Sequence, residues 1–261
     1  MTNHNIDYKI YGEELQYVEI ELDPNETAIA ESGAFMMMEE GIEMQTMFGD
    51  GSQQQTGILG KLLSAGKRLL TGESLFMTAF TNIGQGKKRV SFAAPYTGKI
   101  IALDLSVLGN KVIAQKDAFL CAAKGVSIGI EFQRKLGTGL FGGEGFIMQK
   151  LEGDGLAFCH AGGYVTQRIL QPGEILKVDT GCVVAYTAGV NFDIEFVRGI
   201  KNFMFGGEGL FFAKLQGPGT IWLQSLPISR LAGRILQYST TTRKEEGSIL
   251  GGIGNLLDGR G

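Results

Sequence analysis

The chain has 261 residues, of which 44% are hydrophobic and 20% are charged, so it can bury a sizeable core. A net charge of −3 argues against a nucleic-acid-binding protein, which usually carries a basic face. Residues 1–7 are polar, and no apolar run reaches the ~18 residues of a membrane span, so we expect a cytoplasmic protein.

In chain order, the first pattern is a turn followed by a short apolar segment. Leu-Asp-Pro-Asn-Glu at 22–26 returns as Leu-Gln-Pro-Gly-Glu at 170–174. Further along, Gly-Ile-Glu-Met at 41–44 returns as Gly-Ile-Glu-Phe at 129–132 and Asp-Ile-Glu-Phe at 193–196. A recurrence of this kind indicates internal repeats.

A second pattern lies downstream in each copy. Phe-Gly-Gly-Glu-Gly-Phe at 141–146 recurs as Phe-Gly-Gly-Glu-Gly-Leu at 205–210, with a weaker copy at 70–75. Each copy leads into an apolar run, a Gly-X-Gly triplet and a second run that carries an aromatic residue. Two apolar runs joined by so short a connection predict a β-hairpin. The triplets are at 84–86, 153–155 and 217–219, and the aromatic residues are Phe92, Phe158 and Trp222.

These patterns predict one all-β domain over residues 1–227, made of three tandem units at 8–95, 98–161 and 162–227. Packed around a pseudo-threefold axis, the units would share one core as a β-barrel or β-sandwich, which also protects sheet edges. The 40 glycines suit the many tight turns of such a fold. The first unit is longer, and apolar spacing predicts one short helix inserted at 57–70.

The C-terminal tail, residues 228–261, lies outside the repeat. Its first part, residues 230–238, fits either a strand or a short helix, and residues 247–257 are apolar but rich in glycine. We expect the tail to dock on the body or on a neighbouring subunit.

Three glutamates of the Gly-Gly-Glu-Gly copies form the only candidate metal site. Around a pseudo-threefold axis, Glu73, Glu144 and Glu208 would form a ring of oxygen ligands for a hard cation. The alternative is that each carboxylate accepts backbone hydrogen bonds in its own turn. A phosphate-binding loop is disfavoured because the motif leads into a strand. A second recurring trio, Glu43, Glu131 and Glu195, is expected at strand edges or facing solvent.

The cysteines and histidines of this sequence do not predict a metal-binding or catalytic site. Cys121, Cys159 and Cys182 match no metal-binding spacing and are expected to be buried free thiols. His160 follows Cys159, and adjacent strand residues point to opposite faces, so we expect a structural histidine without a catalytic pairing. His4 is the only other histidine, and we predict no cofactor and no catalytic residue.

Two further segments have alternative interpretations. The basic triplet 87–89, with aromatic residues nearby, allows single-stranded RNA binding, although a solvated turn is the simpler interpretation. Met36, Met37 and Met38, with Met44 and Met47, indicate core or subunit-interface packing, or a groove for a hydrophobic partner.

The triplicated Gly-Gly-Glu-Gly pattern and the Leu-x-Pro-x-Glu turn together resemble the mitochondrial-biogenesis (altered inheritance of mitochondria) family, in its bacterial branch, over residues 8–227. The resemblance implies a β fold like that of the tryptophan RNA-binding attenuator protein (TRAP-like), with pseudo-threefold repetition. It also implies homo-oligomers, with a trimer as one form. Eukaryotic relatives are associated with inner-membrane organisation, and the family offers no catalytic residues.

Three functions follow as hypotheses. The first is a non-enzymatic scaffold or interaction protein, peripheral to a membrane, with the tail as the contact for a protein or a membrane surface. The second is a small-ligand or metal-binding β-barrel module. The third, RNA binding, rests on fold analogy alone.

Overall fold

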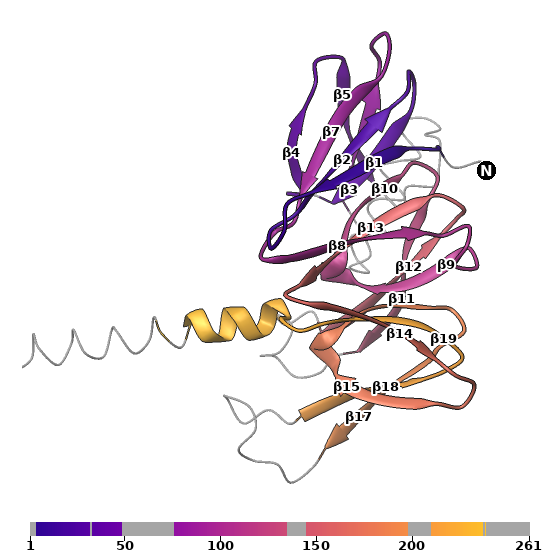
Figure 1. Ribbon diagram of the computed structural model, residues 1–261, viewed down its shortest axis with the longest axis vertical. Helices are drawn as coiled ribbons and strands as arrows, with labels where there is room; N and C mark the ends of the chain where they lie inside the picture. Colours follow the sequence, from indigo (N-terminus) through magenta and orange to yellow (C-terminus); the bar gives the residue numbers. More distant parts are fainter. Residues whose placement is uncertain are drawn as a thin grey trace, which may run out of the picture.

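The computed structural model describes residues 4–31, 33–48, 76–134, 145–197, 210–236 and 238. Within these residues the chain is almost entirely β-structure arranged as four sheets (Figure 1). The helix predicted at 57–70 lies outside the described residues, and so do the three Gly-Gly-Glu-Gly segments apart from residues 145, 146 and 210.

The first and fourth sheets are small and lie at the two ends of the molecule (Figure 1). In spatial order, the first sheet consists of β1 (Asp7–Tyr11), β2 (Tyr17–Leu22), β7 (Lys88–Ala93) and β4 (Phe35–Met38). The fourth sheet consists of β15 (Ile175–Asp179), β18 (Leu210–Gln216) and β17 (Asn191–Val197).

The second and third sheets each have six strands and lie between the small ones. In spatial order, the second consists of β5 (Ile42–Phe48), β6 (Phe76–Asn82), β3 (Thr27–Glu31), β10 (Phe119–Ala123), β13 (Leu156–Gly162) and β8 (Gly98–Asp104). The third consists of β11 (Ser127–Arg134), β12 (Phe146–Glu152), β9 (Lys111–Gln115), β16 (Val183–Thr187), β19 (Gly219–Gln224) and β14 (Val165–Leu170). Short 3₁₀ turns, η1 (Lys116–Ala118) and η2 (Thr180–Cys182), precede β10 and β16.

The two six-stranded sheets have the same strand order. Raising each strand number of the second sheet by six gives the order of the third sheet. We refer to β2–β7, β8–β13 and β14–β19 as the first, second and third strand sets. Half of each large sheet comes from one set and half from the next. The sets join where β3 pairs with β10 and where β9 pairs with β16.

Both joints have the same antiparallel register. Ala30 lies opposite Cys121 in one joint, and Ala114 lies opposite Ala185 in the other. A bulge interrupts the other side of β10 and β16 at matching places, and β4 carries it as well. Small side chains suit these strands because the large sheets are covered on both faces.

Three apolar cores separate the four sheets. The middle core lies between the two large sheets and includes Ile29, Leu151 and Trp222. The first and second sheets enclose a core around Phe80 and Phe92. The third and fourth sheets enclose another, with eleven buried residues that include Phe146 and Leu215. The inner strands of the large sheets are therefore buried on both faces, as in β10, where all five residues are buried.

The predicted hairpins are wrong. Each Gly-X-Gly triplet connects two strands of different sheets: β6 to β7, β12 to β13 and β18 to β19. β12, for example, pairs with β11 and β9, whereas β13 pairs with β10 and β8. The short connection takes the chain from one layer to the next, because both strands already have partners from elsewhere in the sequence.

The predicted barrel is also not formed. In no sheet of the described residues do the first and last strands pair with each other, so each sheet stays open. The sheets follow one another along the long axis of the molecule (Figure 1). The TRAP-like pseudo-threefold arrangement stays a prediction.

The Leu-x-Pro-x-Glu turns do recur as local structures. In the first, the carboxylate of Glu26 accepts a hydrogen bond from the backbone N–H of Asp23 at 2.8 Å. In the second, Glu174 accepts one from Gln171 at 2.9 Å. Asn25 and Gly173 have positive φ angles of 70° and 78°, which asparagine and glycine tolerate best. The two turns therefore connect β2 to β3 and β14 to β15 in the same way.

Candidate functional site

The three members of the predicted glutamate ring, Glu73, Glu144 and Glu208, lie outside the described residues. The second trio is not brought together. Glu43 lies on β5, Glu131 on β11 and Glu195 on β17, in three different sheets. Across the described ranges, no group of three or more His, Cys, Asp or Glu side chains is placed to hold a metal ion.

Two members of this second trio form ion pairs on the surface. The ammonium of Lys111 lies 3.0 Å from the carboxylate of Glu131. Glu195 pairs with Lys177 and, at 3.7 Å, with Lys214. These cations hold the pKa of the Glu195 carboxyl below its ordinary value, with the Lys177 hydrogen bond as the main cause. The three glutamates therefore lie at separate places on the surface and do not form a shared site.

Two members of the basic triplet, Lys87 and Arg89, pair with acidic neighbours on the outer face of the first sheet. Lys87 lies 2.8 Å from Glu21 and 3.1 Å from Asp7. Arg89 lies 3.0 Å from Glu21 and within 4 Å of Glu19 and Glu39. Lys87 and Arg89, both hydrogen-bonded to Glu21, lower the pKa of its carboxyl. The arrangement disfavours RNA binding, because a phosphate would have to displace carboxylates already in place.

Cys159 and His160 face opposite sides of β13. Cys159 contributes to the middle core, and Cys121 is also buried as a free thiol. Cys182 is only half-buried, which differs from the expectation that all three thiols are buried. Burial raises the pKa of the Cys159 thiol to about 12 and lowers the pKa of the His160 imidazole to about 4. Neither group is poised for nucleophilic or acid–base work near neutral pH.

One pocket of about 290 Å³ lies where the third and fourth sheets meet. The Tyr186 and Phe192 rings stack in it with their centroids 5.4 Å apart, and the Lys111–Glu131 ion pair lies at its wall. Its volume is at the low end for small-molecule sites. The residues that line it are Lys111, Ile113, Glu131, Phe132, Tyr186, Ala188, Val190 and Phe192.

A Met-rich apolar surface lies along β4 and the start of β5. Phe35, Met36, Met37 and Met38 are 39–48% exposed, and Met44 is 46% exposed. Phe35 also stacks on Phe80 of the core at 5.5 Å. This segment is therefore anchored at one end and accessible along the rest, which fits an interface more closely than a core.

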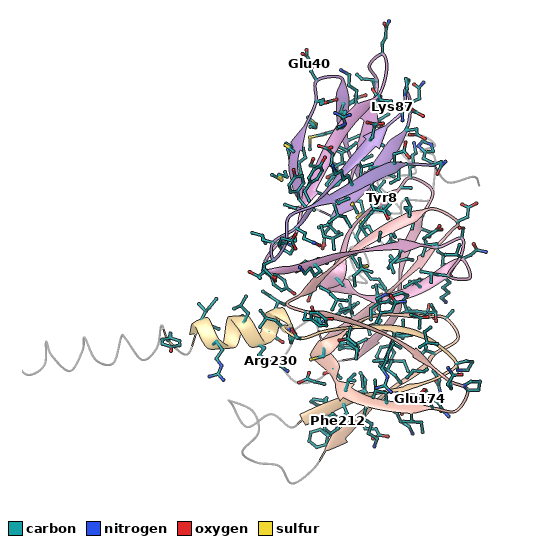
Figure 2. The ribbon with its side chains drawn as sticks, in the orientation of Figure 1. Tyr8, Glu40, Lys87, Glu174, Phe212 and Arg230 are labelled. Carbon is teal, nitrogen blue, oxygen red and sulfur yellow. The ribbon has the colours of Figure 1, made fainter. Side chains whose placement is uncertain are left out.

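A helix over residues 228–236 leaves the body after β19 and projects away from it (Figure 1). Arg230 lies where it leaves the body, and its guanidinium donates a hydrogen bond to the carbonyl of Ser225 at 3.1 Å (Figure 2). The hydroxyl of Tyr96 interacts with the backbone of Ile228. The sequence left strand and helix open for this segment, and the structure shows a helix.

The helix is amphipathic. At 100° per residue, Ile228, Leu231, Ile235 and Leu236 fall within one arc, whereas Arg230 and Arg234 fall on the opposite side. Ile235 is 60% exposed and Leu236 is 65% exposed. In the sequence, the i, i+3, i+7 spacing of Ile228, Leu231 and Ile235 is the pattern that would have predicted this amphipathic helix. No described helix has the length and apolar character needed to cross a bilayer.

Comparison with known proteins decides the family. The model of the family described as mitochondrial biogenesis AIM24 matches residues 8–226. The chain belongs to this family. It is 30% identical over 229 residues to an uncharacterised protein of Streptococcus pyogenes serotype M6, covering 86% of this chain and 87% of that one.

The fold has a counterpart among solved structures. The X-ray structure of a Streptococcus pyogenes protein from a structural genomics consortium superposes with a TM-score of 0.68. It covers 90% of this AIM24-family chain and 100% of the other chain, at 23% identity. At 23% identity this similarity is evidence for the fold alone. The family resemblance predicted from the sequence is confirmed by the match of the family model.

Proposed function

We propose that this protein is a non-enzymatic scaffold that attaches to a membrane surface through its C-terminal helix. The observation that carries the proposal is the exposed apolar arc of residues 228–236 on a helix that projects from the body. A helix with one apolar side and arginines on the other suits the boundary between lipid headgroups and acyl chains. The β body would then be held close to the bilayer.

The charges support an anionic surface. Arg230 and Arg234 lie on the polar side of the helix, so both would face headgroups while the apolar arc is inserted. Arg230 also lies 3.5 Å from Asp179, which ties the base of the helix to β15. Because the helix has few turns, we expect weak, reversible binding that depends on salt.

The test is co-sedimentation of the full chain with vesicles of phosphatidylglycerol mixed with phosphatidylcholine, and with phosphatidylcholine alone. We expect binding to the anionic vesicles, reduced at least ~10-fold by Ile235→Glu combined with Leu236→Glu, because both apolar contacts are lost. Ile169→Glu, at a 65% exposed residue on β14, is the matched control. The proposal is wrong if the chain ignores both vesicles, or if the control weakens binding equally.

A second candidate, small-ligand binding, has the pocket between the third and fourth sheets in its favour. Its stacked rings and its ion pair would suit a small aromatic or planar ligand with a charged group. A thermal-shift screen of such compounds tests it. A hit must lose its shift in Tyr186→Ala and keep it in Tyr164→Ala, an exposed tyrosine between β13 and β14. A screen without any shift would overturn the candidate.

A further inference from the structure

The pocket between the third and fourth sheets has aromatic residues where the preceding strand set has aliphatic ones. Tyr186 lies opposite Ile113, in the same register in which Ala122 lies opposite Ile29. Ala122 and Ile29 are fully buried in the middle core. Because an alanine is enough to pack the equivalent place one set earlier, the architecture itself does not require the ring of Tyr186.

Phe192 differs from its counterpart in the same way. It lies opposite Leu215 on β18, as Ile128 lies opposite Leu151 on β12. Ile128 is 1% exposed and fills the middle core, whereas Phe192 is half-buried and lines the pocket. Aromatic surface that the repeated fold does not demand, placed at a pocket, favours a flat ligand.

The N-terminal segment closes the corresponding place in the preceding set. The backbone N–H of His4 donates to the carbonyl of Lys124 at 3.0 Å. The Nδ1 atom of His4 accepts from the backbone N–H of Thr27 at 2.9 Å. Burial, followed by the charge of Lys124, lowers the pKa of the His4 imidazole, which keeps the ring neutral and Nδ1 an acceptor. One histidine thus bridges the end of the β3–β10 joint with one donor and one acceptor.

The third set has the same two backbone groups at its pocket. By the shared register, Lys111 corresponds to Thr27. Ala188, one residue after β16, corresponds to Lys124, one residue after β10. Both Lys111 and Ala188 line the pocket. Among the described residues, none makes the equivalent of the His4 bonds to the Lys111 N–H and the Ala188 carbonyl.

We propose that the pocket binds a nitrogen heteroaromatic ring that bridges Lys111 and Ala188 as His4 bridges their counterparts. A ring nitrogen accepts from the Lys111 N–H, and an N–H group beside it donates to the Ala188 carbonyl. The ring lies against Tyr186, and any charged group on the ligand would extend towards the Lys111–Glu131 ion pair. Aminopurines and aminopyrimidines belong to this class. The inference rests on the small-ligand candidate above and does not involve membrane attachment.

Isothermal titration calorimetry of the full chain with 9-methyladenine tests the bridge. This compound carries an amino donor beside ring-nitrogen acceptors. The analogue with a dimethylamino group keeps the ring but has no N–H donor, so it should bind at least ~10-fold more weakly. Equal binding of the two compounds would overturn the bridge and leave the small-ligand candidate standing. If neither compound binds, the inference is wrong, and the thermal-shift screen above then decides the candidate on its own.

Nuclear magnetic resonance locates the bound ring. In nitrogen-15-labelled protein, the Lys111 amide proton should move downfield on addition of 9-methyladenine, because it gains a hydrogen-bond acceptor. The amide proton of Thr27 is already bonded to His4 and should stay in place. Binding that leaves the Lys111 signal unchanged would overturn the proposal, because the ring would then lie elsewhere.

A double variant that copies the preceding set gives an independent measurement. Tyr186→Ala combined with Phe192→Ile installs the residues found at the equivalent places, and circular dichroism checks that the variant folds. Affinity for 9-methyladenine should fall at least ~10-fold, because the aromatic surface is lost. Tyr164→Ala, at a 74% exposed tyrosine outside the pocket, should bind like the wild type. A folded double variant with wild-type affinity would overturn the proposal.

Discussion

The ring of Tyr96 stands edge-on to the imidazole of His160, with the ring centroids 4.4 Å apart and the planes at 87°. Tyr96 lies in the connection between β7 and β8, and His160 lies on β13 and is only 2% exposed. The tyrosine also reaches the backbone of Ile228, where the C-terminal helix begins. These two rings therefore link the interior of the second sheet to the base of the projecting helix.

His160 should make the fold sensitive to acid. Burial lowers its pKa to about 4 in the folded protein, against 6.5 for the free side chain. Between these pH values His160 binds a proton in the unfolded chain but not in the folded chain. The free energy of unfolding therefore falls as the pH drops from about 6.5 towards 4. His160→Phe should flatten this part of the profile. Urea unfolding at pH 7.5 and pH 5 measures it, and an unchanged pH dependence in the variant would contradict the assignment.

Glu31 should act in the opposite direction. Burial, followed by repulsion from Asp117, raises the pKa of this carboxyl from 4.5 to about 7. The folded state holds the proton more tightly, so this stabilisation is complete below pH 4.5 and is lost as the pH rises through 7. At pH 8, Glu31→Gln should raise the free energy of unfolding by about 1–3 kcal/mol. Glu43→Gln, at an exposed residue of β5, is the control and should change the free energy of unfolding little.

Gly162→Ala should be strongly destabilising. A Cβ atom at this position would lie 2.0 Å from the carbonyl oxygen of Leu226 and 2.5 Å from the ring of Tyr96. The backbone of the segment before the helix cannot give way cheaply, so we expect a loss of about 2 kcal/mol or more. Thermal unfolding measures the loss, and wild-type stability in the variant would show that Leu226 is not packed there.

Asn82 should be the main support of the first Gly-X-Gly connection. Its buried amide donates to the carbonyl of Leu22 at 2.9 Å and to that of Gly86 at 2.8 Å. Its side-chain oxygen accepts from the N–H of Gly84 at 2.9 Å. Asn82→Ala should cost about 2–4 kcal/mol by leaving these groups unpaired. Asn82→Asp keeps the acceptor but loses both donors, so chemical denaturation should find it destabilised as well.

Gly233→Ala should stabilise the C-terminal helix. A Cβ atom at Gly233 would contact nothing within 4 Å, so the change acts on the helix alone. Alanine favours a helix interior over glycine by about 0.8–1.0 kcal/mol. Circular dichroism should detect greater helicity, and binding to anionic vesicles should tighten if the helix is the attachment point. Greater helicity without tighter binding would count against membrane attachment.

The sequence predicted strands well but their partners poorly. The runs at 76–80, 147–151 and 211–215 do lie in β6, β12 and β18. Period-two alternation and turn residues are local signals, so they locate strands without naming the neighbours. The burial of β12 on both faces shows that its neighbours come from distant parts of the chain. No local pattern distinguishes a hairpin from a crossing between layers.

The aromatic alignment shows the same limit. By pairing, Ser91 rather than Phe92 occupies the place of Phe158 and Trp222, since Met37 lies opposite Ser91 as Cys121 lies opposite Phe158. Phe92, one residue further along β7, pairs with Phe35 as Cys159 pairs with Phe119, so the aligned aromatic residues differ in register by one residue. The candidate site was a different matter. Motif spacing in the sequence singled out acidic residues and cysteines as candidates, and not the apolar residues of the C-terminal helix. Exposure of Ile235 and Leu236 depends on where the helix leaves the body, which sequence does not specify.

The shared sheets also bear on how such a chain can grow or shrink. β3 pairs with β10, and β16 occupies the equivalent position one strand set later. Excising residues 98–162 would remove one complete set and bring β3 against β16, with the register of both original joints preserved. Chain length in this architecture can therefore change by whole sets without inventing a new contact. A gain or loss of one set is a smaller evolutionary step than the rebuilding of any single sheet.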